Sequence, residues 1–344
     1  MIELTDPKIQ KYLTPYRYEK PVLHGSGILG AFDEKAVDIP FVFWHQNKYY
    51  MLYTGFDGKG YQSALATSDD LLHWEHKGVI LKRNLDSDRW DRIGGAATWM
   101  IKESDDFNQI PKLGKVDGKY WMVYHSYPSQ QANETGPAEI GLAWTEDEEL
   151  LDWHFPDKPC FSWKDGADWE AGGLYKACII RNNDIWYMFY NAKDKEERWT
   201  EQTGVATSKD LLHWERYEGN PVMKVNRESW DERFVSDPYI VKDGDIWVNF
   251  YFGYGKIYED GHSHAQEGLA LSADLLHWEK VREPILSFGP EGTYYSGHVH
   301  KASIVKKDDT LYHFYCATCP WKEGDPTSAY GEYRTICVAA NKKF

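Results

Sequence analysis

Two aspartates and two histidines have the types and local sequences that suit chemistry on a substrate. Asp38 lies in an Asp-Ile-Pro stretch, Asp237 lies in Ser-Asp-Pro, and His298 and His300 lie in the stretch YSGHVHKAS. A carboxylate can take a proton from water, and an imidazole with a pKa near about 6.5 can carry a proton at neutral pH. Two carboxylates and a proton carrier are the groups that cleavage of a glycosidic bond requires. The hypothesis holds only if the fold brings these residues together.

The elements that must position these residues belong to a repeat. The hexapeptide DLLHWE occurs at 70–75, 210–215 and 274–279, and a variant, ELLDWH, stands at 149–154. Upstream of each copy lies a β-type run, a polar turn and a second run with alternating aromatic residues, which is typical of a hairpin. A third short run precedes the hexapeptide and a fourth follows it. Each repeat therefore predicts four antiparallel strands, with the hexapeptide as the connection from the third strand to the fourth.

Five such units predict an all-β fold, a five-bladed β-propeller in which residues 1–344 form a single catalytic domain. The second unit carries an insertion between the two halves of its hairpin. The fifth unit ends without a fourth run, while the segment YEKPVLHG at 18–25 resembles the fourth runs of the other units. We therefore expect the N-terminal strand to complete the last blade and close the ring. In the hexapeptide, Asp should cap the turn, and Leu and Trp should pack between blades.

The repeats agree at one acidic position. Seven residues before the start of the first strand's core stand Asp33, Asp91, Glu170 and Asp231, each after an aromatic residue. A carboxylate that recurs in four units is typical of a structural device, such as a loop cap. This argues against chemistry at Glu170, although Glu170 stays a candidate catalytic acid.

The repeats disagree at the two positions where the innermost strands begin. These positions hold Asp38 and Ile39, Ala96 and Ala97, Tyr175 and Lys176, Ser236 and Asp237, and His300 and Lys301. Because innermost strands line the shaft of a propeller, these side chains should converge at one end. The predicted site contains Asp38, Asp237, His300, Glu170, His298, Tyr175, Lys176, Lys301 and Arg92. The alternative is that these polar groups only form hydrogen bonds around a wet channel.

The chain resembles the five-bladed propeller glycosidases, the superfamily of glycoside hydrolase families 32, 43, 68, 117 and 130. Connections of the TSDDLLHWE type, hairpins such as KYYMLYTG and the carboxylates at blade starts carry the resemblance. It implies that Asp38 is the general base or nucleophile and that Asp237 orients the sugar and tunes the acid. In families 32 and 43 the acid is a glutamate of blade three, where WEAGGLYKA offers Glu170. In family 117 the proposed acid is a histidine, for which His298 and His300 are the candidates.

The net charge and the amino-acid composition limit the kinds of partner and cofactor that we expect for this chain. The formal net charge is −15 and no basic run occurs, which argues against nucleic acid or an anionic membrane as a partner. The start of the chain has no apolar signal segment, and five cysteines suit reduced thiols, so a cytoplasmic location is expected. Cys316 and Cys319 form a single Cys-x-x-Cys pair. A zinc site usually needs four ligands, so neither a metal nor another cofactor is expected.

The sequence thus predicts a glycosidase that acts on a short oligosaccharide, exo-acting and inverting. Asp38 would activate water, and His300 or Glu170 would protonate the leaving oxygen. One alternative is a phosphorylase of the family 130 type, with Lys176, Lys301 and Arg92 as the anion site. Another is a non-catalytic, sugar-binding propeller. The sugar, its anomer and the oligomeric state do not follow from the sequence.

Overall fold

The structure, a computed structural model, describes residues 1–129 and 136–344. The described residues form four antiparallel sheets, one of which joins two strand groups through a single parallel pair, Glu201 with Phe234. Unit one contains β3 (Ala36–His45), β4 (Lys48–Phe56), β5 (Tyr61–Ser68) and β6 (Glu75–Leu81), and unit two contains β7 (Ala96–Met100), β8 (Tyr120–Ser126) and β9 (Glu139–Thr145). Unit three contains β10 (Gly173–Asn182), β11 (Ile185–Lys193), β12 (Glu201–Ser208) and β13 (Glu215–Arg216), and unit four contains β14 (Phe234–Asp243), β15 (Ile246–Tyr254), β16 (Gln266–Ser272) and β17 (Glu279–Lys280). Unit five contains β18 (His298–Lys307), β19 (Thr310–Pro320) and β20 (Glu332–Ala340), together with the N-terminal strands β1 (Tyr16–Arg17) and β2 (Leu23–His24).

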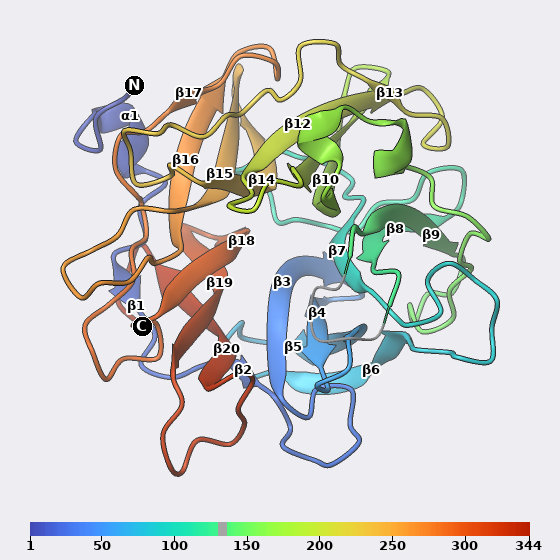
Figure 1. The fold of residues 1–344 in the computed structure, drawn as a ribbon, viewed down its shortest axis with the longest axis horizontal. Coiled ribbons are helices and arrows are strands. Elements are labelled where there is room, and N and C mark those ends of the chain that lie inside the picture. Colours follow the sequence, from blue (N-terminus) through green and yellow to red (C-terminus); the bar gives the residue numbers. More distant parts are fainter. Residues whose placement is uncertain (130–135) are drawn as a thin grey trace.

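The first strands of the units lie around the centre of the molecule (Figure 1). Contacts run from β3 to β7, β10, β14 and β18 in turn, and from β18 back to β3. The hairpins predicted from the sequence are confirmed in all five units. Helical structure in the described residues is limited to α1 (Pro7–Gln10) and the short 3-10 turns η1 (Trp163–Asp165) and η2 (Asp168–Glu170). No helix in the described part of the chain has the length and apolar character needed to span a membrane.

The N-terminal segment joins the last unit. Both β1 and β2 pair antiparallel with β20, the last strand of the chain, and Leu23 faces Ile336. The pairing expected for residues 18–25 is therefore present at Leu23–His24. Upstream of it, Tyr12 packs against Phe107 and Phe250 and its hydroxyl donates to Asp243 at 2.7 Å.

The hexapeptide forms the same turn each time. In the first copy, Asp70 Oδ1 accepts hydrogen bonds from the backbone N–H groups of Leu72 and His73, both at 2.8 Å, and Trp74 Nε1 donates to the Leu71 carbonyl. The same bonds recur in the copies at 210–215 and 274–279. The predicted Asp cap is therefore confirmed. It also holds buried Leu71 at a φ of 75°, a conformation that leucine rarely adopts.

The fourth strands differ in length between the units. Only unit one has a long one, β6, whereas β13 and β17 contain two residues each. Among the described residues of unit two, isolated bridges at Ile140–Phe161 and Trp144–His154 replace the strand. Units two to four carry a proline here (Pro159, Pro221 or Pro284) where unit one has Val79. Proline cannot donate to a strand ladder, so the predicted fourth strand is present but short in units three and four, and it is wrong for the described residues of unit two.

The insertion in unit two closes one end of the central channel. Residues 101–119 lie between β7 and β8, and they contact the far ends of the other four first strands. These contacts are hydrogen bonds from Trp44 N to Pro111 O, from Arg181 N to Asp105 Oδ2, from Lys242 N to Asp105 O, and from Lys306 Nζ to Asn108 Oδ1. The channel is therefore covered at the end opposite to the strand starts.

Candidate active site

Every first strand has a β-bulge near its start, at the end of the molecule that residues 101–119 do not cover. The register shifts once in each of β3, β7, β10, β14 and β18, at or directly after the two positions where the repeats differ. Three of the bulged residues, Ile39, Asp237 and Lys301, have φ values of 49°, 54° and 66°. Non-glycine residues in this region cost roughly 1–3 kcal/mol each and cluster at functional sites. The strain turns these residues into the centre of the molecule.

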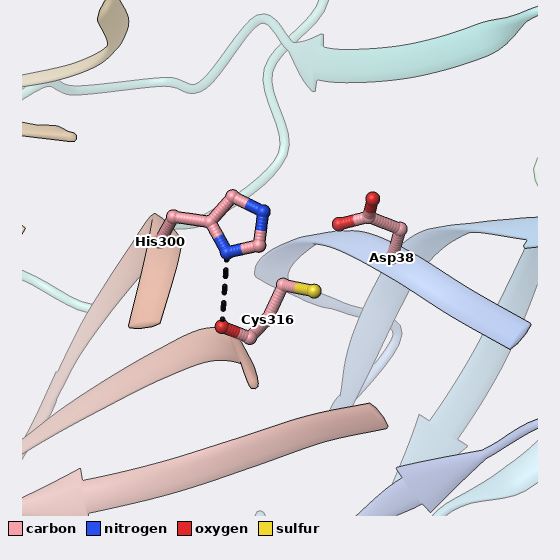
Figure 2. Close-up of side chains that lie close together, drawn as sticks. All are labelled: Asp38, His300 and Cys316. Atoms are coloured by element: carbon pink, nitrogen blue, oxygen red, sulfur yellow. Dashed lines mark hydrogen bonds between the residues drawn. The ribbon is translucent and has the colours of Figure 1, made fainter. Parts of the chain in front are cut away.

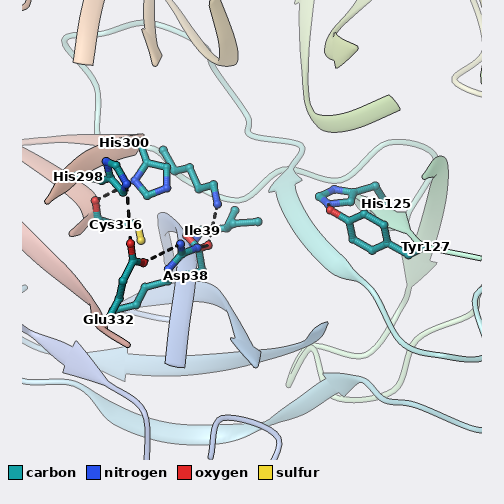
Figure 3. Close-up of polar contacts among 10 residues, drawn as sticks. Asp38, Ile39, His125, Tyr127, His298, His300, Cys316 and Glu332 are labelled. Atoms are coloured by element: carbon teal, nitrogen blue, oxygen red, sulfur yellow. Dashed lines mark hydrogen bonds and ion pairs between the residues drawn. The ribbon is translucent and has the colours of Figure 1, made fainter. Parts of the chain in front are cut away.

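A cavity of about 240 Å³ opens between these bulges. Its wall comes from equivalent places on three strands of the units. The bulges contribute Ile39, Tyr175, Lys176, Asp237, His300 and Lys301; the second strands contribute His125, Asn191 and Phe252; and the third-strand starts contribute Tyr61, Glu201 and Arg334. Tyr127, Trp199 and Phe234 complete the wall. Figure 3 shows Asp38 and His300 on one side, and His125 and Tyr127 on the other. We refer to this space as the central cavity.

Asp38 lies buried at the edge of the central cavity in an ion-pair cluster. Its Oδ2 accepts hydrogen bonds from Lys301 Nζ at 2.7 Å and Arg334 Nη1 at 3.0 Å, and its Oδ1 accepts from the Ile39 backbone N–H at 2.8 Å. Burial raises the pKa of Asp38, but Lys301 and Arg334 outweigh burial and hold its pKa well below the usual range. Asp38 is therefore a fixed anion whose charge is shared by two cations.

Three buried side chains could in principle ligate a metal ion. Asp38, His300 and Cys316 each place one ligand atom within 4.8 Å of the others (Figure 2). However, Lys301 and Arg334 already bind Asp38. Burial raises the pKa of the Cys316 thiol well above its usual value, whereas a thiol must lose its proton to bind a metal. The cluster therefore fits an internal ion pair better than a metal centre.

The histidines of the site are neutral. His300 Nδ1 lies 3.3 Å from the Cys316 carbonyl oxygen and must donate to it, so Nε2 carries no proton in the neutral ring. Burial lowers the pKa of His300 well below 6.5, and Lys301 lowers it further. Burial also lowers the pKa of His125 to about 3 and that of His298 to about 4. At neutral pH His300 Nε2 can accept a hydrogen bond from a ligand but has no proton to donate. His298 Nδ1 accepts from the Ala265 backbone N–H at 3.1 Å, so its neutral ring carries the proton on Nε2.

Glu201 and Asp237 are the carboxylates on the wall of the central cavity. Glu201 Oε2 accepts from Asn191 Nδ2 at 3.0 Å and from Ser236 Oγ at 3.2 Å, and Oε1 accepts from Trp199 Nε1 at 3.4 Å. Glu201 is half-buried at the rim, whereas Asp237 is 4% exposed and lies deeper. Ser236 joins the two carboxylates, since its hydroxyl binds Glu201 and its backbone continues into Asp237.

A further buried pair lies around Asp237. Lys176 Nζ donates to the Asp237 backbone carbonyl at 3.3 Å, and burial lowers the pKa of Lys176. Glu267 is fully buried, and neither of its carboxyl oxygens makes a hydrogen bond of normal geometry to the described residues. Burial raises the pKa of Glu267 well above its usual value, against the opposing charge of Lys176. Glu267 is therefore best described as a neutral acid inside the protein.

Most of the residues predicted from sequence lie at this end of the molecule. Asp237, His300, Lys301, Tyr175 and Lys176 line the central cavity. Asp38 lies directly behind Lys301, and His298 lines a neighbouring cavity. Two predicted residues, Glu170 and Arg92, lie elsewhere.

Glu170 and Arg92 belong to the outer parts of the units. Glu170 is fully buried, accepts a hydrogen bond from the Tyr190 hydroxyl, and pairs with Arg216 at 2.8 Å. Arg92 lines a separate cavity beside Asp91. The first-strand alignment assigned Arg92 to the funnel because it stands near a strand start, but the loop before β7 directs it to another surface.

Sequence reasoning missed the cavity residues of the second and third strands. Tyr61, Glu201 and Arg334 occupy equivalent third-strand starts, where units two and four carry Ala138 and Ala265. Only first-strand positions had been compared between repeats. The same comparison at the third strand would have found this variable position and its single carboxylate.

Residues 99–287, more than half of the chain, match the family model described as "Glycosyl hydrolases family 32 N-terminal domain". The chain belongs to this family. Its all-β fold is of the type found in propeller glycoside hydrolases and phosphorylases.

Two curated relatives come from Thermoanaerobacter sp. (strain X514). A 1,2-beta-oligomannan phosphorylase is 30% identical over 129 residues, which cover 36% of this chain and 42% of the relative. A beta-1,2-mannobiose phosphorylase is 26% identical over 228 residues, which cover 52% of this chain and 69% of the relative. The match to the first relative thus spans less than half of its length.

Solved structures match over nearly the whole chain. A structure described as "Glycoside hydrolase" is 28% identical with a TM-score of 0.81, and the match covers 98% of this chain and 94% of the other. A structure from the GH130 family of mannoside phosphorylases, a family reported to contain glycoside hydrolases, is 15% identical with a TM-score of 0.67, over 96% and 97% of the two chains. The second likeness shows the fold alone.

Proposed function

We propose that this protein hydrolyses glycosides and releases the terminal sugar of a short oligosaccharide bound in the central cavity. The observation that carries the proposal is the pair of carboxylates, Glu201 and Asp237, on the wall of a small cavity ringed by aromatic residues. Aromatic faces stack on sugar rings, and two carboxylates can supply the acid and the base of glycoside cleavage. Exo action fits a channel whose far end is covered by residues 101–119.

Phosphorolysis is the second candidate, because two relatives are phosphorylases. It requires cations that can bind inorganic phosphate next to the sugar. Lys301 and Arg334 are both bound to Asp38, and Arg334 also contacts Glu332. Only Lys176 remains among the lysines and arginines of the described cavity wall, and it contacts the Asp237 carbonyl. This pairing favours water over phosphate as the acceptor.

We assign the roles of acid and base to Glu201 and Asp237 from the depth of each carboxylate in the central cavity. In a blind pocket the leaving group points outward, so Glu201 at the rim would protonate the leaving oxygen. Asp237, deeper in the cavity, would activate water. Asp38 was predicted as the base, but a carboxylate that binds two cations is a weak proton acceptor. We therefore propose that Asp38 holds Lys301 and Arg334 in place, and that neutral His300 accepts a hydrogen bond from a sugar hydroxyl.

The proposal is tested with a panel of aryl glycosides and neutral oligosaccharides, incubated with and without inorganic phosphate. Hydrolysis predicts free sugar at the same rate in both conditions, and we expect the anomer seen first by NMR to be inverted. A sugar 1-phosphate that forms only with phosphate would establish phosphorolysis instead. Absence of turnover on the whole panel, together with binding of sugars, would favour a non-catalytic propeller.

We also infer that the five units are the blades of one propeller closed by β1 and β2. The ring of contacts among first strands and the pairing of both N-terminal strands with β20 support this inference. Deletion of residues 1–25 would expose the edge of β20 and should cause aggregation. A truncated protein that stays monomeric, with an unchanged melting temperature, would contradict the closure.

A further inference from the structure

A second and larger cavity lies beside the central one, between units four and five. Its volume is about 780 Å³, against about 240 Å³ for the central cavity. The ends of β15 and β19, the starts of β18 and β20, and residues 260–264 and 288–291 of two loops form its wall. These strand ends lie on the face at which the central cavity opens. We refer to this second cavity as the side groove.

The strands β18 and β20 border both cavities, and residues two positions apart on each strand line different cavities. Along β18, His300 lines the central cavity and His298 lines the side groove, with ring centroids 6.2 Å apart. Along β20, Arg334 lines the first and Glu332 the second, and Arg334 Nη2 donates to Glu332 Oε2 at 3.3 Å. Figure 3 shows His298 and Glu332 next to His300 and Asp38. A ligand that leaves the central cavity past these residues enters the side groove directly.

The side groove is lined by groups that suit uncharged sugars. Its described wall contains Asp260, Glu291 and Glu332 but neither lysine nor arginine. Asp260 Oδ2 lies 2.7 Å from His264 Nε2, and Glu332 pairs with Arg334, so Glu291 is the wall carboxyl with no ion pair to the described residues. A wall of this charge would repel uronic acids and sugar phosphates.

Aromatic and hydroxyl groups add to this chemistry. Phe288 stacks on His264 with centroids 3.9 Å apart and is partly exposed to the groove. Ser263 and Ser296 add two further polar residues to the described wall. Stacking faces and hydroxyl-binding groups without a cation are what a neutral sugar residue requires.

We propose that the side groove binds the further, uncharged sugar residues of the oligosaccharide whose terminal residue occupies the central cavity. This proposal rests on the proposed function and adds a direction and a substrate class to it. The chain would run from the central cavity, past His298 and Glu332, toward Phe288. The enzyme would then act on neutral oligosaccharides of several residues in preference to acidic ones.

The test compares substrates of different length and charge. An aryl glycoside of the sugar selected by the panel needs only the central cavity, whereas the neutral tetrasaccharide ending in that sugar needs both. We expect kcat/KM to be at least about tenfold higher for the tetrasaccharide than for the aryl glycoside. Phe288→Ala should reduce this ratio roughly tenfold. Tyr217→Ala removes a partly exposed aromatic residue that lines neither cavity, and it should leave the ratio unchanged.

Three outcomes would overturn the groove proposal. They are a tetrasaccharide that is no better a substrate than the aryl glycoside for the wild type, an unchanged ratio in Phe288→Ala, and a wild-type preference for a tetrasaccharide that carries a uronic acid. If no substrate of the whole panel is hydrolysed, the proposed function fails, and binding to oligosaccharide arrays then tests the groove by itself. Binding of neutral chains that weakens in Phe288→Ala would then support the groove. Binding of acidic chains, or of none, would refute it.

Discussion

Two sets of carboxylates differ in their surroundings. The outer set lies in the segments that precede the first strands, and the inner set lies around the central cavity. In the outer set, Asp91, Glu170 and Asp231 each accept a hydrogen bond from a second-strand tyrosine, which is Tyr124, Tyr190 or Tyr251. Each also pairs with a cation, which is Arg89, Arg216 or Lys280.

The inner set has no such shared pattern. Asp38 binds two cations, Glu201 binds two polar side chains and an indole, and Asp237 stands in a strained bulge. A contact that recurs in several units meets a requirement of the fold, whereas a contact made once meets a requirement of one site. Burial alone does not separate the sets, because both contain carboxylates that are less than 5% exposed.

The largest expected effect is on turnover at the inner set. Glu201→Gln and Asp237→Asn should each lower kcat by about 10³-fold or more while the melting temperature stays within a few degrees. On a dinitrophenyl glycoside, which leaves without protonation, Glu201→Gln should recover most of its activity and Asp237→Asn should not. The reverse pattern of recovery would exchange the two roles. Retention of wild-type kcat by both variants would remove them from catalysis.

Asp38 should differ from both sets, because its loss removes the carboxylate that pairs with Lys301 and leaves Arg334 paired with Glu332 alone. Asp38→Asn should lower the free energy of unfolding by roughly 3–5 kcal/mol, measured by urea denaturation. The double variant Asp38→Asn, Lys301→Met should regain part of this loss, which a double-mutant cycle would detect. If Asp38→Asn is as stable as the wild type, the ion-pair cluster does not carry the role proposed for Asp38.

A smaller effect is expected in the outer set. Asp231→Asn and Glu170→Gln should each cost roughly 1–3 kcal/mol of stability, because the cation loses its charged partner and one accepting oxygen is replaced by an NH2 group. Their kcat should stay within about tenfold of wild type, since neither residue lines the central cavity. A thousandfold loss of kcat at an unchanged melting temperature, in either variant, would erase the distinction between the two sets.

The smallest effect concerns pH. Burial and, to a smaller extent, the charge of Arg17 lower the pKa of His313 to about 3. The unfolded chain takes up a proton near pH 6.5 and the folded protein does not, so stability is full above about pH 6.5 and falls as the pH drops toward 3. His313→Phe should lessen this fall by up to about 1.4 kcal/mol per pH unit. Urea denaturation between pH 7 and 4 measures the slopes, and equal slopes in both proteins would contradict the assignment.

Local sequence was sufficient for the repeated parts of the fold. The hairpins and the Asp cap of DLLHWE depend on residues within a few positions of one another, and such patterns can be read along the chain. Proline in the fourth runs was equally visible, but its effect on the ladder was overlooked.

The sequence by itself determined the all-β repeat, the N-terminal strand beside β20 and the variable first-strand positions, because each depends on short-range patterns or on differences between copies. Only the tertiary structure decided which polar side chains share a cavity. Glu201, His125 and Arg334 come from three units and meet across the centre, and Lys301 and Arg334 neutralise Asp38 from the far end of the chain. Distances between units are set by the packing of whole sheets, and no local pattern encodes that packing.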